Sequence, residues 1–372
     1  MSETRTRVGS AALLLCLGGF GLTACGSDST TSSGGSSSAS PSIANCATGN
    51  INAAGASSQK NAIDTWVANY QQACAGSTIN YQSVGSGAGI QSFNQGSIAF
   101  AGSDSALKVP DEQNAANKRC SGGQAINLPM VAGPIAVAYN LSGVSGLILD
   151  APTMADIFAT KITKWNDPAI AALNPGVTLP STAIQAFHRS DASGTTDNFT
   201  KYLAAAAPQQ WTYATGKEWT APGGQGAKGS EGVTSAIQQT DGAIGYVEFS
   251  YAQTAKLGVT TVATGAPQPV PLTPENVANG VAQATVSGSG NNLPLNLNST
   301  YTTKAANAYP ILLVTYEITC SAGLPSDQSA LVKSFLGYTA SSGGQGILSG
   351  LGYAPLPASI QSQVQSAVQT IS

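Results

Sequence analysis

Arg189-Ser190-Asp191-Ala192-Ser193-Gly194-Thr195-Thr196 is the most informative part of the sequence for predicting the fold. The apolar run 183–187 before it predicts a strand, and residues 197–203 after it predict the first turns of a helix. A helix begins with backbone N–H groups that have no partner within the helix, and its dipole adds partial positive charge there. This strand–turn–helix unit is therefore suited to binding an oxyanion.

The side chains of this stretch add to that suitability. Arg189 supplies a full charge and a planar donor fork, and Asp191, two residues on, can fix the guanidinium. Ser193 and Thr195 add hydroxyl donors, and Gly194 lets the backbone approach a ligand closely. An ordinary Ser/Thr-capped helix with a surface ion pair explains the same residues equally well. The rest of the chain has to decide between the two.

Composition argues against a polyanionic partner. Only 9% of the 372 residues are charged, and the net charge is −3, so the sequence does not indicate a nucleic-acid surface. A small anion would have to be held by local donors against an acidic background. That favours a buried, preorganised site over a basic patch.

Residues 1–24 have the pattern of a targeting segment. Arg5 and Arg7 form a basic start, the apolar run 11–22 is too short to span a bilayer, and small residues precede Cys25. The segment resembles a bacterial lipoprotein signal. We expect cleavage before Cys25, lipid such as palmitate on its thiol, and anchoring to the outer face of the cytoplasmic membrane. A plain secretory signal or an uncleaved anchor is the alternative.

A tether and a folded part follow the signal. Residues 25–45 are almost wholly Ser, Thr, Gly, Ala and Pro, which predicts a flexible tether. Cys16 leaves with the signal, and four cysteines remain beyond Cys25, which allow three pairings. No two of these lie close in sequence and the chain has one His, so disulfides are favoured over a metal site. The four are Cys46, Cys74, Cys120 and Cys320.

Three consecutive strand–helix units open the folded part. Each predicted strand ends in a turn of small residues before a helical pattern begins. The strands are 51–54, 78–84 and 98–101, the turns are 55–58, 85–89 and 102–105, and the helices are 59–74, one that begins near 90, and 110–119. In a parallel α/β sheet these turns lie at the carboxyl edge, where such sheets bind ligands.

Four motifs stand in the order and spacing of a known family. They are residues 54–57, 84–89, 102–104 and 189–195, with further matches at 153–168 and 232–248. From about residue 50 to its end, the chain resembles the phosphate-binding proteins of phosphate-specific ABC transporters. Each motif alone is weak, and four in register are specific.

The resemblance implies an α/β, two-lobed periplasmic-binding-protein fold of type II, with the anion in the cleft. The apolar runs 134–141 and 311–320 resemble the family's two hinge-crossing strands. Lobe I would then comprise 46–135 and 310–372, and lobe II 136–309. Antiparallel pairing of the two runs would bring Cys320 towards the segment after Cys120. This topology favours the pairs Cys46–Cys74 and Cys120–Cys320.

The resemblance also assigns a phosphate site. Asp104 would be its only acceptor and Asp191 a supporting residue. Two positions depart from the family: Ser58 stands where an aromatic residue is usual, which leaves its backbone N–H as the donor, and Ala192 stands where Gly is frequent, which requires a negative φ. The expected donors are Ser57, Ser58 and Ser86 from lobe I, and Arg189, Ser193, Gly194 and Thr195 from lobe II.

Asp104 can discriminate between oxyanions on chemical grounds. Phosphate near neutral pH carries a proton that a carboxylate can accept, whereas sulfate carries none. An unpaired buried charge costs more than the roughly 1 to 3 kcal/mol of a neutral group, so strong selectivity follows. The alternative is that Asp104 only caps the next helix, the commoner role for Asp in such a turn.

The sequence thus predicts a lipid-anchored extracytoplasmic receptor that binds inorganic phosphate and delivers it to an ABC permease, without catalysis, cofactor, metal or nucleic acid. One alternative is a receptor for another tetrahedral oxyanion, sulfate or molybdate, against which Asp104 argues. The other is a phosphate-ester hydrolase, which needs metal ligands or an activated nucleophile; one His and no carboxylate cluster disfavour it.

Three further features have plainer interpretations. His188 should point away from Arg189, because adjacent residues on a strand face opposite sides. Residues 223–232, with Lys228, lack the Gly-x4-Gly-Lys-Ser/Thr spacing and a helix directly after a strand, so we expect a mobile surface loop. The four tryptophans are expected in the core.

Overall fold

The computed structural model describes residues 43 and 45–372. The expected signal, Cys25 and most of the expected tether lie outside this part. Among the described residues, no helix combines the length and apolar character needed to cross a membrane.

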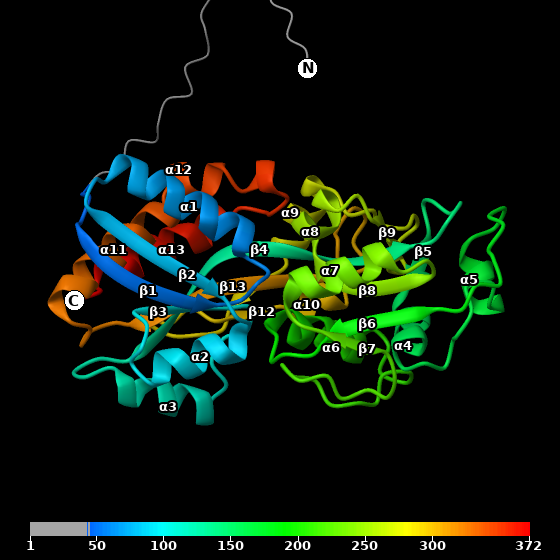
Figure 1. The fold of residues 1–372 in the computed structure, drawn as a ribbon, viewed down its shortest axis with the longest axis horizontal. Helices are drawn as coiled ribbons and strands as arrows, with labels where there is room; N and C mark the ends of the chain where they lie inside the picture. The colour runs from blue at the N-terminus through cyan, green and yellow to red at the C-terminus, as the bar shows by residue number, and fades with distance from the viewer. Residues whose placement is uncertain (1–42, 44) are drawn as a thin grey trace, which may run out of the picture. The chain divides into compact units, whose positions relative to one another are not determined.

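A single path of strands runs through the described chain (Figure 1), in the order β2-β1-β3-β13-β4-β8-β6-β7, with β9 also on β4. β1 is parallel to β2 and β3, whereas β13 is antiparallel to both β3 and β4. β8 is antiparallel to β4, and β6 is parallel to β8 and β7. This mixed α/β sheet confirms the predicted fold class.

We call the elements at one end of this path lobe I, seen in blue, cyan, orange and red in Figure 1. They comprise the three predicted strand–helix units and the C-terminal part of the chain. The elements are β1 (Gly49–Gly55), α1 (Lys60–Ala73), β2 (Ser77–Ser83), α2 (Ser86–Asn94), β3 (Phe100–Ser103), α3 (Asp111–Arg119), β13 (Leu312–Cys320), α11 (Ser326–Thr339), α12 (Ser342–Gly346), a 3-10 helix (Ser349–Leu351) and α13 (Ala358–Gln369).

Lobe II lies at the other end of the path, seen in green and yellow-green. Its elements are β5 (Ile148–Asp150), α4 (Ala151–Phe158), α5 (Pro168–Leu173), β6 (Gln185–Arg189), α6 (Gly194–Ala206), β7 (Gln225–Ala227), α7 (Gly229–Gln239), β8 (Ala243–Glu248), α8 (Phe249–Thr254), β9 (Gly258–Val259) and β10 (Thr261–Ala263).

A connecting segment leads from lobe II back to β13. It contains α9 (Pro274–Val281), β11 (Thr285–Val286), β12 (Leu295–Asn296) and α10 (Asn298–Tyr301). Its β11–β12 ribbon hydrogen-bonds to lobe I, because the Leu293 N–H donates to the Asn127 carbonyl and the Leu295 N–H to the Tyr316 hydroxyl. The limits 136–309 for lobe II stay a prediction.

β4 (Ala125–Asn140) crosses between the lobes, and its pairing differs from the one expected. β13 pairs with the first part of β4, from Cys320 opposite Ala125 to Leu312 opposite Pro134. The remainder, from Ile135 onward, pairs with β8. The run 134–141 is therefore not the main partner of 311–320. Both strands are buried along nearly their whole length, so their apolar sequences carry no register signal.

Local patterns predict the helices well. α1 buries Ala62, Ile63, Trp66 and Tyr70, which recur at helical spacing.

Two disulfides join Cys46 to Cys74 and Cys120 to Cys320, which are the favoured pairs.

Candidate functional site

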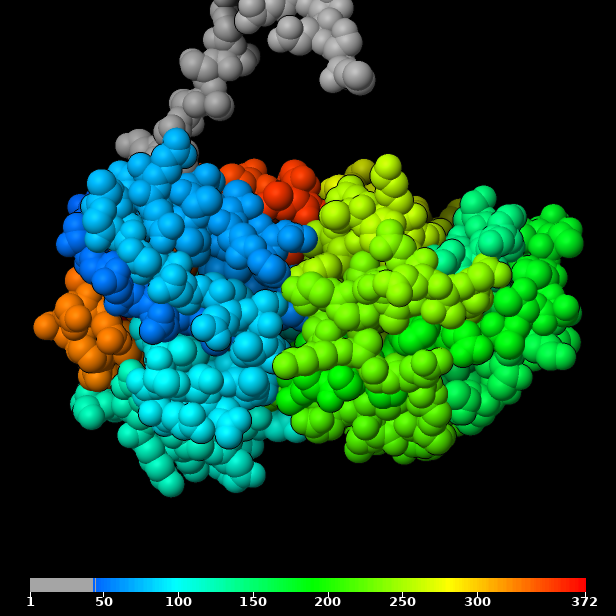
Figure 2. All heavy atoms as spheres, in the orientation of Figure 1, coloured from blue at the N-terminus to red at the C-terminus, as the bar shows by residue number. Residues whose placement is uncertain are grey.

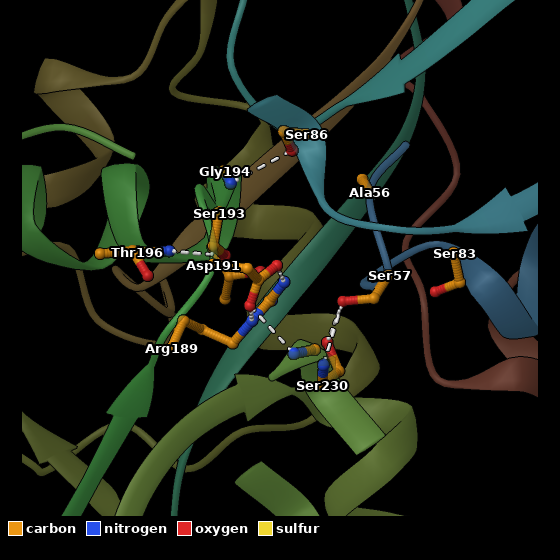
Figure 3. Close-up of polar contacts among 12 residues, drawn as sticks. Ala56, Ser57, Ser83, Ser86, Arg189, Asp191, Ser193, Gly194, Thr196 and Ser230 are labelled. Carbon is orange, nitrogen blue, oxygen red and sulfur yellow. Dashed lines mark hydrogen bonds and ion pairs between the residues drawn. The ribbon is translucent and has the colours of Figure 1, made fainter. Parts of the chain in front are cut away.

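The predicted turns of both lobes converge at one place (Figure 3). Ser57 follows β1, Ser86 begins α2, and Asp104 follows β3. From lobe II, the Gly194 N–H donates to Ser86 Oγ at 3.1 Å and Thr195 Oγ1 donates to Asp104 Oδ2 at 3.2 Å. The structure therefore holds the two lobes closed on each other, and Figure 2 shows their surfaces meeting along a seam.

Arg189 is the buried cation of the site, with 2% of its surface exposed. Its Nε donates to Asp191 Oδ1 at 2.7 Å and its Nη2 donates to Oδ2, so both carboxylate oxygens accept from one edge of the guanidinium. Burial opposes ionisation of Asp191, but the hydrogen bonds and charge of Arg189 outweigh it and hold its pKa below the usual value. Nη1 of Arg189 donates to no group in the described chain, which leaves its N–H groups for a ligand.

Asp104 is buried and is surrounded by hydroxyl groups. Ser58 Oγ donates to Oδ1 at 2.5 Å and Thr315 Oγ1 donates to the same atom at 2.8 Å. Burial raises the pKa of Asp104 above its usual value, although these hydroxyls, the charge of Arg189 and Thr195 act in the opposite direction. Oδ2 receives only the longer bond from Thr195, so it retains capacity to accept a proton from a ligand.

Ser86 can serve a ligand only as a donor. Its Oγ accepts from the N–H groups of both Gly194 and Asp104, at 3.1 and 3.2 Å. A hydroxyl oxygen has two lone pairs and one proton, so its acceptor capacity is filled. The proton of Ser86 has no acceptor within the described residues and is free for an oxyanion.

The start of α6 has the expected capped form. Ser193 is the N-cap, and its Oγ accepts from the Thr196 N–H at 3.3 Å. A Cβ on Gly194 would lie 2.5 Å from the Asp104 Cβ and 2.7 Å from Ser86 Oγ, so only glycine lets the lobes approach here. Ala192 keeps a negative φ, as its departure from the family pattern requires.

The interpretation of residues 223–232 as a loop was wrong. The stretch contains β7, one connecting residue and the start of α7, which is a further strand–turn–helix unit. Its helix start reaches the site, where the Gly229 N–H donates to Asp191 Oδ1 and the Ser230 N–H donates to Ser57 Oγ, at 2.9 and 3.0 Å. β7 has three residues and no apolar alternation, so periodicity could not reveal it. The Gly229-Ser230 pair was the available signal.

Other missed residues support the turns from behind. Asn198 Nδ2 donates to the carbonyls of Asp104 and Gly194, at 2.7 and 2.8 Å, and so ties α6 to the β3 turn. The Tyr251 hydroxyl donates to the Ser57 carbonyl at 2.7 Å. Thr315 lies in the apolar run of β13, where a single threonine gives no functional signal.

His188 and Trp219 form a stack outside the site. Their ring centroids are 4.8 Å apart and their planes differ by 8°. This confirms that His188 is a packing residue that faces away from Arg189. Trp66, Trp165 and Trp211 are buried in the core as predicted, whereas Trp219 is half-buried.

Two further carboxyls are buried close to the site without a cation. Desolvation raises the pKa of Glu248 to about 8, against hydrogen bonds from Ser250, and the pKa of Glu317 also to about 8. Both oxygens of Glu317 lack a partner within the described chain, as does Gln59 Oε1. Gln59 lies beside Glu317 and opposes the rise of its pKa, and neutral Glu317 carries a proton that it can donate to an acceptor such as Gln59 Oε1.

The assembled site is rich in donors and has one carboxylate with free acceptor capacity. The site also contains one fixed cation, several hydroxyls and the starts of helices α2, α6 and α7. This arrangement suits a small oxyanion that carries a proton.

Comparisons with known proteins agree with this geometry. A model of the PBP superfamily domain matches residues 40–342. The chain is 44% identical to the phosphate-binding protein PstS 3 of Mycobacterium tuberculosis, over 98% of this chain and 99% of that protein. It is 36% identical to the phosphate-binding protein PstS of Xylella fastidiosa, over 85% and 84% of the two chains. A high-affinity periplasmic phosphate-binding protein, PfluDING, solved with bound phosphate, has the same fold with a TM-score of 0.69, 22% identity, and coverage of 86% of this chain and 93% of that one.

Proposed function

The chain belongs to the PstS phosphate-binding proteins of the PBP superfamily, and from this premise we propose that it binds inorganic phosphate and delivers it to an ABC permease. The family is one of binding proteins, not of enzymes. The observation that carries the proposal for this chain is Asp104, a buried acceptor in a site otherwise made of donors.

We assign the phosphate contacts by hydrogen-bond capacity. Nη1 of Arg189 and the proton of Ser86 are the donors that the protein leaves unused. Ser57 Oγ already accepts from the Ser230 N–H, so its own proton can turn from Ser230 Oγ, 2.9 Å away, to the ligand. The backbone N–H of Ser58 donates in place of its side chain, which Asp104 occupies.

The start of α6 completes the assignment. Ser193, Gly194 and Thr195 present the positive end of the helix to the anion. Gly194 contributes through Ser86 Oγ, to which its N–H donates. Asp104 Oδ2 accepts the proton of the phosphate, and Asp191 keeps Arg189 in place.

Calorimetry on protein freed of bound anion tests the binding. Charge-assisted hydrogen bonds contribute roughly 1.5 to 3 kcal/mol each, and micromolar affinity needs about 8 kcal/mol, so we expect micromolar or tighter phosphate binding at one site per chain. Sulfate and molybdate should compete poorly. If either binds as tightly as phosphate, the oxyanion assignment is wrong.

A chromogenic phosphate ester, with and without divalent metal, tests the hydrolase alternative. We expect no turnover under either condition. Metal-dependent release of the chromophore that saturates with substrate would place the chain among enzymes.

We also propose that Cys25 carries the lipid anchor and that residues 25–45 tether the protein to the outer face of the cytoplasmic membrane. Two disulfides among the described residues support an oxidising, extracytoplasmic address. Mass spectrometry of the mature N-terminus should find a lipid-modified Cys25. An unmodified cysteine there would contradict the anchor.

Movement of lobe II against lobe I about β4 and β13 would open the site for loading and delivery.

A further inference from the structure

One ion pair joins the two lobes at the mouth of the site. Among the described residues there are five ion pairs, and four of them link residues at most five positions apart in sequence. The fifth joins Lys217 of lobe II to Glu112 of α3 in lobe I, 105 residues away. In a chain with 9% charged residues, this interlobe pair stands apart from the others.

The pair is well formed at both ends. Lys217 Nζ lies 2.8 and 3.0 Å from the two carboxylate oxygens of Glu112. Glu112 is in the first turn of α3, where its Oε2 also accepts from the Lys108 N–H at 2.9 Å. The side chain of Lys217 is 8% exposed and that of Glu112 is 30% exposed, so water screens this pair less than a surface pair.

Lys217 is also joined to the phosphate-binding elements of lobe II. Its carbonyl accepts from the N–H of Ser193, the N-cap of α6, at 2.9 Å. Two residues further, Trp219 stacks on His188, the neighbour of Arg189. The loop that contains Lys217 and Trp219 therefore contacts Ser193, one of the residues that would hold the anion, and His188, the neighbour of Arg189.

The pair lies in a groove beside the site. This groove, of about 490 Å³, is lined by Glu112 and Lys217, and also by Asp191, the partner of Arg189. The ion pair therefore joins the two lobes next to a residue that supports the site's cation.

We infer that Lys217 and Glu112 form an interlobe clasp that closes after phosphate has bound and slows its release. This inference rests on the proposed function. The pair requires contact between the lobes, so it stabilises the closed state and contributes nothing to the open state that loads phosphate. Its loss should raise the dissociation rate and leave the association rate nearly unchanged.

Release of labelled inorganic phosphate, chased with unlabelled phosphate and followed by rapid filtration, tests the clasp. For Glu112→Gln we expect phosphate release to be about 5- to 30-fold faster. This lies between the effect of breaking an exposed ion pair and that of breaking a buried one. The association rate should change less than twofold. The matched control is Asp156→Asn, because Asp156 pairs with Lys161 within lobe II and is 28% exposed, close to the value for Glu112. Release from this control should match the parent protein.

A double-mutant cycle separates the clasp from a general structural role. Lys217→Gln alone should also speed release, and combining it with Glu112→Gln should add little, since either change breaks the same pair. Fully additive effects, or a Glu112→Gln release rate equal to that of Asp156→Asn, would overturn the clasp. Should Lys217→Gln not fold, the comparison of Glu112→Gln with Asp156→Asn decides alone. Calorimetry on the parent protein comes first: absence of phosphate binding there refutes the proposed function itself, whereas tight binding with unchanged release in Glu112→Gln refutes only the clasp.

Discussion

Asp104 in lobe I, which is buried, and Asp191 in lobe II, which is half-buried, belong to one site and differ in what surrounds them. Asp191 accepts two hydrogen bonds from the guanidinium of Arg189 and one from the Gly229 N–H. Asp104 has no cation in contact and is held by the hydroxyls of Ser58, Thr195 and Thr315. The pKa of Asp191 is lowered, whereas the pKa of Asp104 is raised.

The contrast shows how one residue type serves two purposes. A carboxylate paired with Arg189 has both oxygens occupied, so Asp191 acts as a support for the cation. A carboxylate held by hydroxyls alone keeps capacity to accept a hydrogen bond, so we propose that Asp104 accepts the proton of the ligand. In this proposal lobe II supplies the charge that attracts an oxyanion, and lobe I supplies the acceptor that favours a protonated one.

Removing the cation should have the largest effect. Arg189→Ala deletes the charged donor and leaves the half-buried Asp191 without its partner, so phosphate affinity should fall by about 2 to 5 kcal/mol, roughly 30- to 4,000-fold. Calorimetry measures the loss. The double variant with Asp191→Asn should recover part of it, because the unpaired charge is then gone. A loss below threefold for Arg189→Ala would show that this cation does not contact the anion.

Removing the charge of the acceptor should mainly change selectivity. Asp104→Asn replaces a carboxylate by an amide that can donate as well as accept, so sulfate no longer faces an unpaired charge. The preference for phosphate over sulfate should fall by about 1 to 3 kcal/mol, or roughly 5- to 150-fold. Competition calorimetry with both anions checks it. Asp191→Asn, its matched counterpart, should weaken both anions together, and an unchanged preference in Asp104→Asn would remove Asp104 from its role.

Glu317 extends the comparison to a carboxyl with neither cation nor hydroxyl partner. Its pKa is raised from about 4.5 in the unfolded chain to about 8 in the fold, so the folded state binds more protons between these values. The stability from neutral Glu317 is full below pH 4.5 and is lost as pH rises through 8. Between pH 5 and 8.5 the unfolding free energy should decrease, and Glu317→Gln should reduce that decrease by about 1 to 3 kcal/mol. Denaturant titrations at several pH values measure this, and parallel curves for the two proteins would show that Glu317 is ionised in the fold.

The smallest effect is expected at the α7 start. Ser230→Ala removes the hydroxyl beside Ser57 but keeps the backbone N–H that orients it, so phosphate affinity should fall by about 0.5 to 1.5 kcal/mol. Calorimetry against Ser235→Ala provides the control, because Ser235 is a half-buried serine of the same helix whose Oγ accepts from Gln239 Nε2. A loss as large as that of Arg189→Ala would mean that α7 contacts phosphate as a principal donor.

The turns of both aspartates could be predicted because their signals are local. The strands before Ser57, Asp104 and Ser193 end in Gly and Ser next to amphipathic or capped helices, and the structure forms each unit there. Both disulfides join the pairs that the resemblance favoured, although β13 pairs with another part of β4 than the one from which Cys120–Cys320 was expected.

The missed features depend on contacts between distant parts of the chain. β7 is too short for a periodic pattern, so the α7 start could not be placed at the site. Thr315 and the register of β13 on β4 lie in strands buried on both faces, where apolar sequence does not distinguish one alignment from another. The sequence does not distinguish Glu317 from an exposed charged residue, because its burial is known only from the structure.

A crystal structure of the protein with phosphate bound is the decisive experiment, because the proposed site requires both lobes to hold one anion. We predict a single phosphate that contacts Nη1 of Arg189 from lobe II and Oδ2 of Asp104 from lobe I at the same time. A phosphate bound by only one lobe, or bound away from both of these atoms, would contradict the account.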